Sequence, residues 1–430
     1  MSKYSKWYSL VSATSLVCLM AGCGGGGGGS SPILSNSVAS SSASVMTTVS
    51  SASSAVPVVS SSSASSQMVV APAVPENAKF AQNITGTLLL VGQEKVSLDE
   101  YIGALGQPAG LMFYTDLSQQ LGLSAPIGGG GGCDDAGITD LQHYIGGSSP
   151  ASPHAIIQLG LALTGGQLAE VTTGSLDTKI RGLATFLKST GHPILLRIGY
   201  EAEGPWNNYP AATYIQAFQR IVTILRGGQV AGVTGDVADN VAMVWHLAAG
   251  NNAISSYTVD SISEWYPGDA YVDWIAVSWF GQGTNTSGAS SDSLARNVVA
   301  SFAATHAKPL MIAESAPRDF TASPNNQMDP NIPTASTSWA SWYKPILDWN
   351  EANKVRIWSY INQDWRAYPM FAGSCGNGGN IWGNSRIEQI GSTVKSSWQS
   401  MLSSPSATWP VKADSPTLWC DIGFQTSGCK

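Results

Sequence analysis

Two glutamates stand just after short apolar segments of this 430-residue chain. Glu201 follows residues 193–198, in a turn rich in glycine, proline and aromatic residues, and Glu314 directly follows residues 310–313. Two carboxyl groups, one serving as an acid and the other as a base or nucleophile, are what the hydrolysis of a glycosidic bond requires. If both segments are strands of one barrel, with its active site at the carboxyl ends of the strands, the chain is expected to cleave a polysaccharide.

Glu203 competes with Glu201 for the catalytic position, because side chains two residues apart on an extended segment point the same way. Glu201 is closer to the end of the apolar segment, but the residues alone leave both open. A carboxylate directly after a buried strand is costly unless it is paired or solvated, so Glu314 could instead form an ion pair with Arg197 or Arg318. Arg197 interrupts the apolar run, where it could keep a nucleophile ionised or serve only the structure.

Other polar and aromatic residues stand at or just after expected strand ends, where they could contact a sugar. Tryptophans there could stack on sugar rings, although packing in the core is the ordinary role of any single tryptophan. His246 could equally be a structural histidine. The candidate substrate-binding residues are Arg197, Tyr200, Trp206, Asn207, Trp245, His246, Trp279, Asn362, Asp364, Trp365 and Trp382.

Eight short apolar segments, rich in β-branched residues, alternate with helical patterns along the chain. Near-continuous apolar strands separated by helices indicate a parallel sheet that is covered on both faces. Eight such units predict a (β/α)8 TIM barrel as a single catalytic domain, in which Glu201 ends strand four and Glu314 ends strand seven. A doubly wound open sheet is less consistent, since no G-x-G-x-x-G follows the first strand. The expected strands are residues 88–91, 111–115, 155–161, 194–198, 242–246, 274–280, 310–313 and 355–361, and the expected helices include 176–188, 211–226, 292–306 and 336–350.

The first 77 residues differ from the rest. Residues 1–23 have a basic start, a short apolar stretch and a Leu-Met-Ala-Gly-Cys ending, which is typical of a bacterial lipoprotein signal with Cys23 as the lipidated residue. Gly24 after the cysteine favours the outer membrane, facing the cell surface or periplasm. Residues 24–77 are dominated by glycine, serine, alanine and valine and predict a flexible linker, which leaves residues 78–430 for the catalytic domain.

The composition excludes some functions. Only 11% of the residues are charged and the net charge is −7, so no basic face for nucleic acid is expected. The five histidines are scattered, and we expect no metal and no cofactor. Beyond Cys18 and Cys23, four cysteines remain, namely Cys133, Cys375, Cys420 and Cys429. An even number in an exported chain favours two disulfides, although three pairings are open.

The order of several segments resembles glycoside hydrolase family 26, a clan-A family of (β/α)8 barrels, and most of all its β-1,3-xylanase branch. The resemblance covers nearly everything from about residue 85 to residue 400. The segments that carry it are residues 196–207, 244–245, 265–268, 271–274, 308–310, 314–315, 360–365 and 382–386.

This resemblance implies a retaining mechanism, with Glu201 as the acid/base, Glu314 as the nucleophile and a separation of about 5–5.5 Å between their carboxyl groups. It favours Glu201 over Glu203. Tyr200 before the acid/base fits the xylanase branch, but the chain departs from the pattern elsewhere. Trp279 stands where a tyrosine usually bonds the nucleophile, and His246 replaces an amide residue.

We therefore expect a retaining endo-β-glycanase for a plant or algal cell-wall polysaccharide, β-1,3-xylan first. The alternatives are the same chemistry on β-1,4-mannan or a β-glucan, and a non-catalytic surface protein that binds glycans. The expected partners are the polysaccharide and, through the lipid anchor alone, the membrane. We expect a monomer.

Overall fold

The computed structural model describes residues 78–129, 136–146, 150–235, 237–250, 253–280, 286–317, 339–368, 384–389, 391–404 and 407–429. The expected signal segment 1–23, with Cys23, and the expected linker 24–77 lie outside these residues and stay predictions. Of the expected disulfide cysteines, Cys420 and Cys429 are bonded to each other, whereas Cys133 and Cys375 lie outside the described residues. Within the described residues, no helix is long and apolar enough to cross a membrane.

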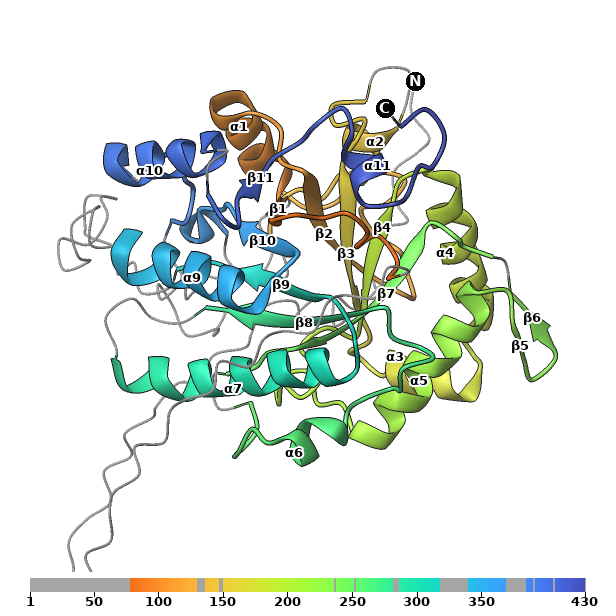
Figure 1. The fold of residues 1–430 in the computed structure, drawn as a ribbon. Coiled ribbons are helices and arrows are strands. Elements are labelled where there is room, and N and C mark those ends of the chain that lie inside the picture. Colours follow the sequence, from red (N-terminus) through yellow and green to blue (C-terminus); the bar gives the residue numbers. More distant parts are fainter. Residues whose placement is uncertain are drawn as a thin grey trace, which may run out of the picture. The chain divides into compact units, whose positions relative to one another are not determined.

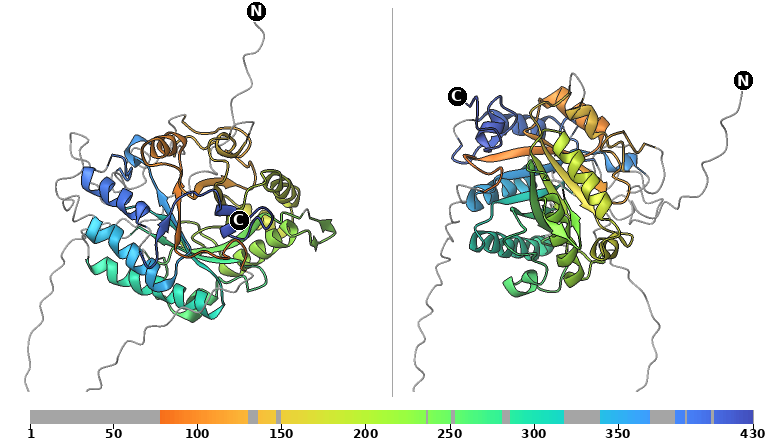
Figure 2. Two further views of the ribbon diagram at one scale, coloured as in Figure 1. Left: turned by 45° about the horizontal axis from the view of Figure 1, so that its top comes forward. Right: turned by 90° about the vertical axis from the view of Figure 1, so that its right-hand side faces the viewer.

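Eight parallel strands close into a barrel, and this confirms the predicted (β/α)8 fold. Each strand pairs with the next along the chain, and β10 pairs back with β1, where Leu88 lies opposite Ile357. Figure 2, left, looks onto this ring of strands. The strands are β1 (Thr87–Gly92), β2 (Gly110–Asp116), β3 (Ile156–Ala162), β4 (Ile194–Ile198), β7 (Val241–Leu247), β8 (Trp274–Trp279), β9 (Leu310–Ser315) and β10 (Ile357–Ile361).

Helices follow the strands and cover the outside of the barrel, with α4 and α5 along one side in Figure 1 and α7, α9 and α10 along the other. The expected helices are present, but α7 begins six residues earlier than residue 292, and a π-helical turn, η1, leads into α9. The helical elements are α1 (Lys95–Leu105), α2 (Leu141–Ile145), α3 (Gln167–Thr173), α4 (Asp177–Ser189), α5 (Ala211–Leu225), α6 (Val259–Ser263), α7 (Thr286–Thr305), η1 (Trp339–Tyr343), α9 (Lys344–Asn353), the 3₁₀ turn η2 (Trp365–Ala367), α10 (Gly391–Ser403) and α11 (Leu418–Asp421).

Two short additions do not belong to the ring of eight. The strands β5 (Gln229–Val230) and β6 (Val233–Thr234) form an antiparallel hairpin after α5, and β11 (Val411–Lys412) pairs with the start of β1. The amino end of the barrel is closed by Phe80 and Ile84, which precede β1, and by Leu418 and Ile422 near the carboxyl terminus. These four side chains pack with apolar residues of the barrel interior.

Side chains alternate between the interior and the helical layer along each strand, as the two-residue period of a strand requires. On β7, Ala242 and Val244 belong to the interior cluster, whereas Met243, Trp245 and Leu247 belong to the layer under the helices. The same alternation on β4 turns Arg197 inward with Leu195. Polar side chains in the interior therefore come from positions that a sequence can identify once the register is known.

A register shift between β8 and β9 interrupts this alternation at Glu314. Val277 lies opposite Ile312, but the next residue, Ser278, lies opposite Glu314, so Ala313 is the extra residue of a β-bulge. Ala313 already points into the interior, and strict alternation would turn Glu314 outward toward the helices. A bulge re-aims the side chain that follows it, and here it places Glu314 beside the inward-facing Ser278.

A buried amide crosses the barrel just below this bulge. Gln158 on β3 donates to the carbonyl oxygen of Ala313 at 2.7 Å and accepts from the Ser359 hydroxyl at 2.5 Å. β3 lies on the side of the ring opposite β9, and Gln158 is fully buried. The two bonds therefore tie the strand that carries Glu314 to the far wall.

Replacing Gln158 by leucine tests this tie. Gln158→Leu keeps the size of the side chain but leaves the Ala313 carbonyl and the Ser359 hydroxyl without their partner, so the free energy of unfolding should fall by about 1–3 kcal/mol for each unsatisfied group. Ser359→Ala removes one of the two bonds and should cost less. Denaturant unfolding measures both, and an unchanged midpoint for Gln158→Leu would contradict the assignment.

Candidate active site

Glu201 and Glu314 meet at the carboxyl end of the barrel, on β4 and β9. Glu201 lies three residues beyond the end of β4, and Glu314 lies within β9. Their side chains are buried, with 8% and 2% of the residue surface exposed. Ser278 joins the two strands at this level, because it lies opposite Glu314 in the sheet and donates a hydrogen bond to Glu201 at 2.7 Å.

The turn after β4 bends sharply to present Glu201. Gly199 and Glu201 both have left-handed backbone, with φ of 56° and 49°, a conformation that costs a residue with a side chain roughly 1–2 kcal/mol. A Cβ atom on Gly199 would lie 2.8 Å from the ring of Tyr214. Asn207 fixes the bend, since its amide donates to the carbonyl oxygens of Tyr200 and Glu201 at 2.9 and 3.0 Å.

Both oxygens of Glu201 accept hydrogen bonds from neutral groups. The Ser278 hydroxyl donates to one oxygen at 2.7 Å and the Trp206 indole to the other at 2.9 Å. Burial, followed by the negative charge of Glu314, raises the pKa of Glu201 to about 8, although the two hydrogen bonds act to lower it. Glu201 therefore carries a proton at neutral pH and can donate it.

Glu203 serves the structure. Its carboxylate accepts from the backbone N–H groups of Ala248 and Ala249 at 3.0 and 2.9 Å, and from the Tyr257 hydroxyl at 2.7 Å. These three donors fasten the turn after β4 to the segment after β7. Glu203 is thus engaged by the fold itself, whereas Glu201 has only the Ser278 and Trp206 side chains as donors.

Arg197 holds Glu314 in a buried ion pair. The Nη1 group of Arg197 donates to Oε1 of Glu314, and the arginine is fully buried. The rings of Tyr114 and Tyr200 lie against the guanidinium, with centroids 4.8 and 5.2 Å from its carbon. Gly160 leaves the space, because a Cβ atom there would stand 2.8 Å from Arg197 Nη2 and 2.7 Å from the Tyr114 ring. Glu314 thus has a cationic partner inside the barrel.

His246 links this ion pair to Ser278. Its Nδ1 atom lies 3.3 Å from Arg197 Nη1 and its Nε2 atom lies 3.1 Å from the Ser278 hydroxyl. Burial, together with the charge of Arg197, holds the pKa of His246 well below its usual value, so the ring is neutral. Sequence reasoning missed Ser278, although alternation from Trp274 through Ala276 would have turned it inward.

Several of the predicted aromatic residues lie away from the two glutamates. Trp245 is fully buried in the outer layer, packed on Tyr266 and Phe302 at 4.9 and 5.5 Å. Trp279 also faces the helices, where Arg296 and Trp349 lie 3.8 and 5.6 Å from its ring. The inward place beside the nucleophile, which we assigned to Trp279, belongs to Ser278, because Glu314 pairs with Ser278 and Ser315 with Trp279.

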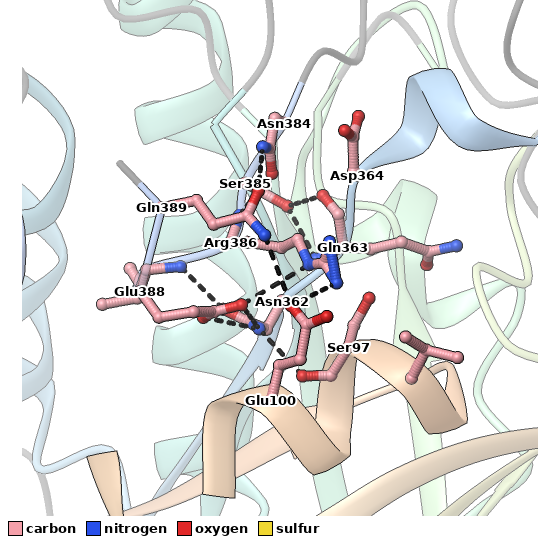
Figure 3. A network of polar contacts seen from close by, with 12 residues as sticks. Ser97, Glu100, Asn362, Gln363, Asp364, Asn384, Ser385, Arg386, Glu388 and Gln389 are labelled. Carbon is pink, nitrogen blue, oxygen red and sulfur yellow. Dashed lines mark hydrogen bonds and ion pairs between the residues drawn. The ribbon is translucent and has the colours of Figure 1, made fainter. Parts of the chain in front are cut away.

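The residues predicted after β10 belong to a separate polar network, shown in Figure 3. The Asn362 amide donates to Glu388 at 3.1 Å, and its carbonyl accepts from the backbone of Ile387 at 2.8 Å. Asp364 pairs with Arg366 at 2.8 Å. Asn362 thus joins the end of β10 to the segment before α10.

Trp365 is buried, and its indole donates to the Ser385 hydroxyl at 3.2 Å. Trp382 and Arg318 lie outside the described residues. No group of three or more histidine, cysteine, aspartate or glutamate side chains in the described part of the chain could hold a metal ion. Of the predicted residues, those that the structure brings together around Glu201 and Glu314 are Arg197, Tyr200, Trp206, Asn207 and His246.

The chain resembles two curated β-1,3-xylanases. It is 28% identical over 354 residues to a β-1,3-xylanase from an Alcaligenes species, a match that covers 80% of this chain and 68% of the relative. It is also 28% identical over 353 residues to a β-1,3-xylanase from a Vibrio species, covering 80% of this chain and 69% of that one. No family model matches the chain.

Among solved structures, a modular endo-β-1,4-mannanase of glycoside hydrolase family 26 from Cellulomonas fimi has 15% identity and a TM-score of 0.42, and the match covers 64% of this chain and 65% of that one. At that TM-score, the fold assignment rests on the closed hydrogen bonding of the barrel itself. The two sequence relatives support a glycoside hydrolase.

The same substitution should affect the two neighbouring glutamates differently, although burial raises the pKa of both carboxyl groups. The pKa of Glu201 is raised on folding from 4.5 to about 8, so the stability that this carboxyl contributes is full below about pH 4.5 and is lost as the pH rises through about 8. Relative to the wild type, Glu201→Gln should therefore gain stability across this window, by at most about 1.4 kcal/mol per pH unit.

Glu203→Gln is the matched control. An amide –NH2 group cannot accept the bonds that Glu203 receives, so this variant should lose about 1–3 kcal/mol. Denaturant unfolding of the wild type and both variants between pH 4 and 9 measures these differences. If the difference between wild type and Glu201→Gln stays constant with pH, Glu201 is not the buried acid.

Proposed function

We propose that this protein is a retaining endo-β-glycanase whose substrate is β-1,3-xylan. The observation that carries the proposal is the contrast between the two buried carboxyl groups, of which Glu201 holds a proton and Glu314 is paired with Arg197. A proton donor and an ionised carboxylate at the carboxyl end of one barrel are the two groups that glycoside hydrolysis uses. The likeness to β-1,3-xylanases over 80% of the chain supports the substrate.

The first step forms a glycosyl-enzyme. An oxygen of Glu314 attacks the anomeric carbon, the bond from that carbon to the leaving sugar breaks, and the proton of Glu201 passes to the leaving oxygen. In the second step, water attacks the same carbon and gives a proton to the ionised Glu201. The ester bond then breaks, Glu314 leaves as a carboxylate, and the product has the original anomeric configuration.

The same machinery could act on β-1,4-mannan or a β-glucan, which is the alternative substrate class. The location is also a proposal. The sequence of residues 1–77 supports an exported lipoprotein, attached to the outer membrane through Cys23 and the flexible linker. An enzyme held in this way would act as a monomer on polysaccharide near the cell.

Removing the nucleophile should separate hydrolysis from binding. Glu314→Ala should lower the release of reducing ends by roughly four orders of magnitude or more, while affinity electrophoresis still shows binding of the polysaccharide. Glu314→Gln also removes the negative charge but keeps an acceptor oxygen for Arg197, so it controls for the lost hydrogen bond. Normal cleavage by both variants would exclude Glu314 as the nucleophile, and a wild type that binds but never cleaves would be a glycan-binding protein.

A panel of polysaccharides tests the substrate and the stereochemistry. We expect the wild type to release reducing ends from β-1,3-xylan faster than from β-1,4-xylan, β-1,4-mannan or mixed-linkage β-glucan. Proton NMR of the first products should show the β-anomer before mutarotation. Activity on mannan alone would contradict the substrate, and an initial α-anomer would contradict the retaining mechanism.

A further inference from the structure

A continuous chain of polar contacts runs from one catalytic glutamate to the other through the barrel interior. The Nη1 group of Arg197 contacts both Oε1 of Glu314 and Nδ1 of His246. The ring then reaches the Ser278 hydroxyl at 3.1 Å, and that hydroxyl reaches Oε1 of Glu201 at 2.7 Å. Arg197 and His246 are fully buried and Ser278 nearly so, which keeps water from replacing any link.

The direction of every hydrogen bond in this chain is determined by the groups themselves. Arginine has donors and no acceptor, so Nδ1 of His246 must accept from Arg197. In the neutral ring, the N–H group is then on Nε2 and donates to the Ser278 oxygen. The Ser278 proton is consequently free to point at Glu201. Each link thus moves electron density toward the cation of Arg197 and presents a polarised hydroxyl to Glu201.

We propose that His246 and Ser278 are positioning residues that transmit the charge of Arg197 to Glu201 when Glu314 has become an ester. This inference rests on the proposed two-step hydrolysis. Before the reaction, the carboxylate of Glu314 balances the cation. Once the ester has formed, that negative charge is gone, and the Nδ1 atom of His246 accepts its hydrogen bond from a guanidinium whose positive charge is no longer balanced.

Hydrogen bonds in a chain strengthen one another when the surroundings are apolar. A stronger pull on His246 makes its Nε2–H group a better donor and Ser278 in turn a better donor to Glu201. That favours the ionised form of Glu201, which the second step requires as a base. The relay therefore helps one carboxyl group to serve first as an acid and then as a base.

Other charged or titratable groups near Glu201 act on it independently of the relay. The negative charges of Glu314 and Glu203 both favour the protonated form, and the cation of Arg197 favours the ionised form. Tyr257 lies on the far side, bonded to Glu203. Ser278 is the residue to change, because its hydroxyl is neutral and its loss leaves all these charges in place.

The Trp206 indole gives a readout that does not depend on activity. Its N–H group donates to Oε2 of Glu201, so its NMR signal should follow the ionisation of that carboxyl group. We expect a titration midpoint near pH 8 in the wild type. In Ser278→Ala the midpoint should rise by roughly one pH unit, since a donor to the charged form is lost. The indole N–H signal that disappears in Trp206→Phe is the signal of Trp206.

Kinetics on an aryl β-glycoside with a good leaving group test the second step. Departure of such a group needs little acid, so hydrolysis of the ester limits the rate. Ser278→Ala should then lower kcat by roughly 10–100-fold and lower KM in parallel, with a burst of the aryl product. His246→Leu breaks the chain one link earlier and should shift kcat and KM in the same direction.

Two controls separate the relay from loss of packing. Ser278→Thr keeps the hydroxyl and should restore the wild-type midpoint. Ser359→Ala removes another buried hydroxyl of the barrel interior that is bonded to Gln158, and it should leave the Trp206 midpoint in place.

An unchanged midpoint in Ser278→Ala, or unchanged kinetics in His246→Leu, would overturn the relay. If the wild type cleaves no β-glycan while the midpoint still shifts, the hydrolase proposal fails and the contact between Ser278 and Glu201 stands.

Discussion

The buried ion pair between Arg197 and Glu314 constrains the rest of the site. Removing two charges from water costs several kcal/mol per ion, and only close pairing with further polar contacts offsets that cost. The neighbouring residues accommodate the ion pair. Gly160 leaves the space for the guanidinium, and the rings of Tyr114 and Tyr200 cover it. Without the pair, neither the inward bend of β9 nor an arginine in the barrel interior would be tolerated.

The same apolar surroundings give the two glutamates opposite charge states. Glu314 has a cation as its partner, whereas the donors to Glu201 are the neutral Ser278 and Trp206. Burial alone would protonate both carboxyl groups, and two adjacent negative charges would repel each other. Arg197 therefore makes the surroundings of the two carboxyl groups unequal, and the negative charge of Glu314 helps to keep the proton on Glu201.

The barrel could be predicted from sequence because eight apolar segments separated by helices admit few other arrangements, and all eight strands are present. The orientations of Ser278 and Trp279 follow from alternation along β8, whereas the inward orientation of Glu314 could not be predicted. The bulge at Ala313 shifts the register of β9 by one residue, and no pattern in an apolar run shows where such a residue will be inserted. The many tryptophans did not indicate the position of the site either. Trp245 and Trp279 pack against the helices and do not line the barrel interior.

His246 on β7 and Ser278 on β8 depend on each other. His246 in the barrel interior needs an acceptor for its Nε2–H group, and Ser278 supplies one. Ser278 in turn directs its own proton to Glu201 because the histidine already occupies its oxygen. A histidine without the serine would bury an unsatisfied donor. The pair is thus one polar unit, inserted between the cation that is paired with Glu314 and the carboxyl group of Glu201.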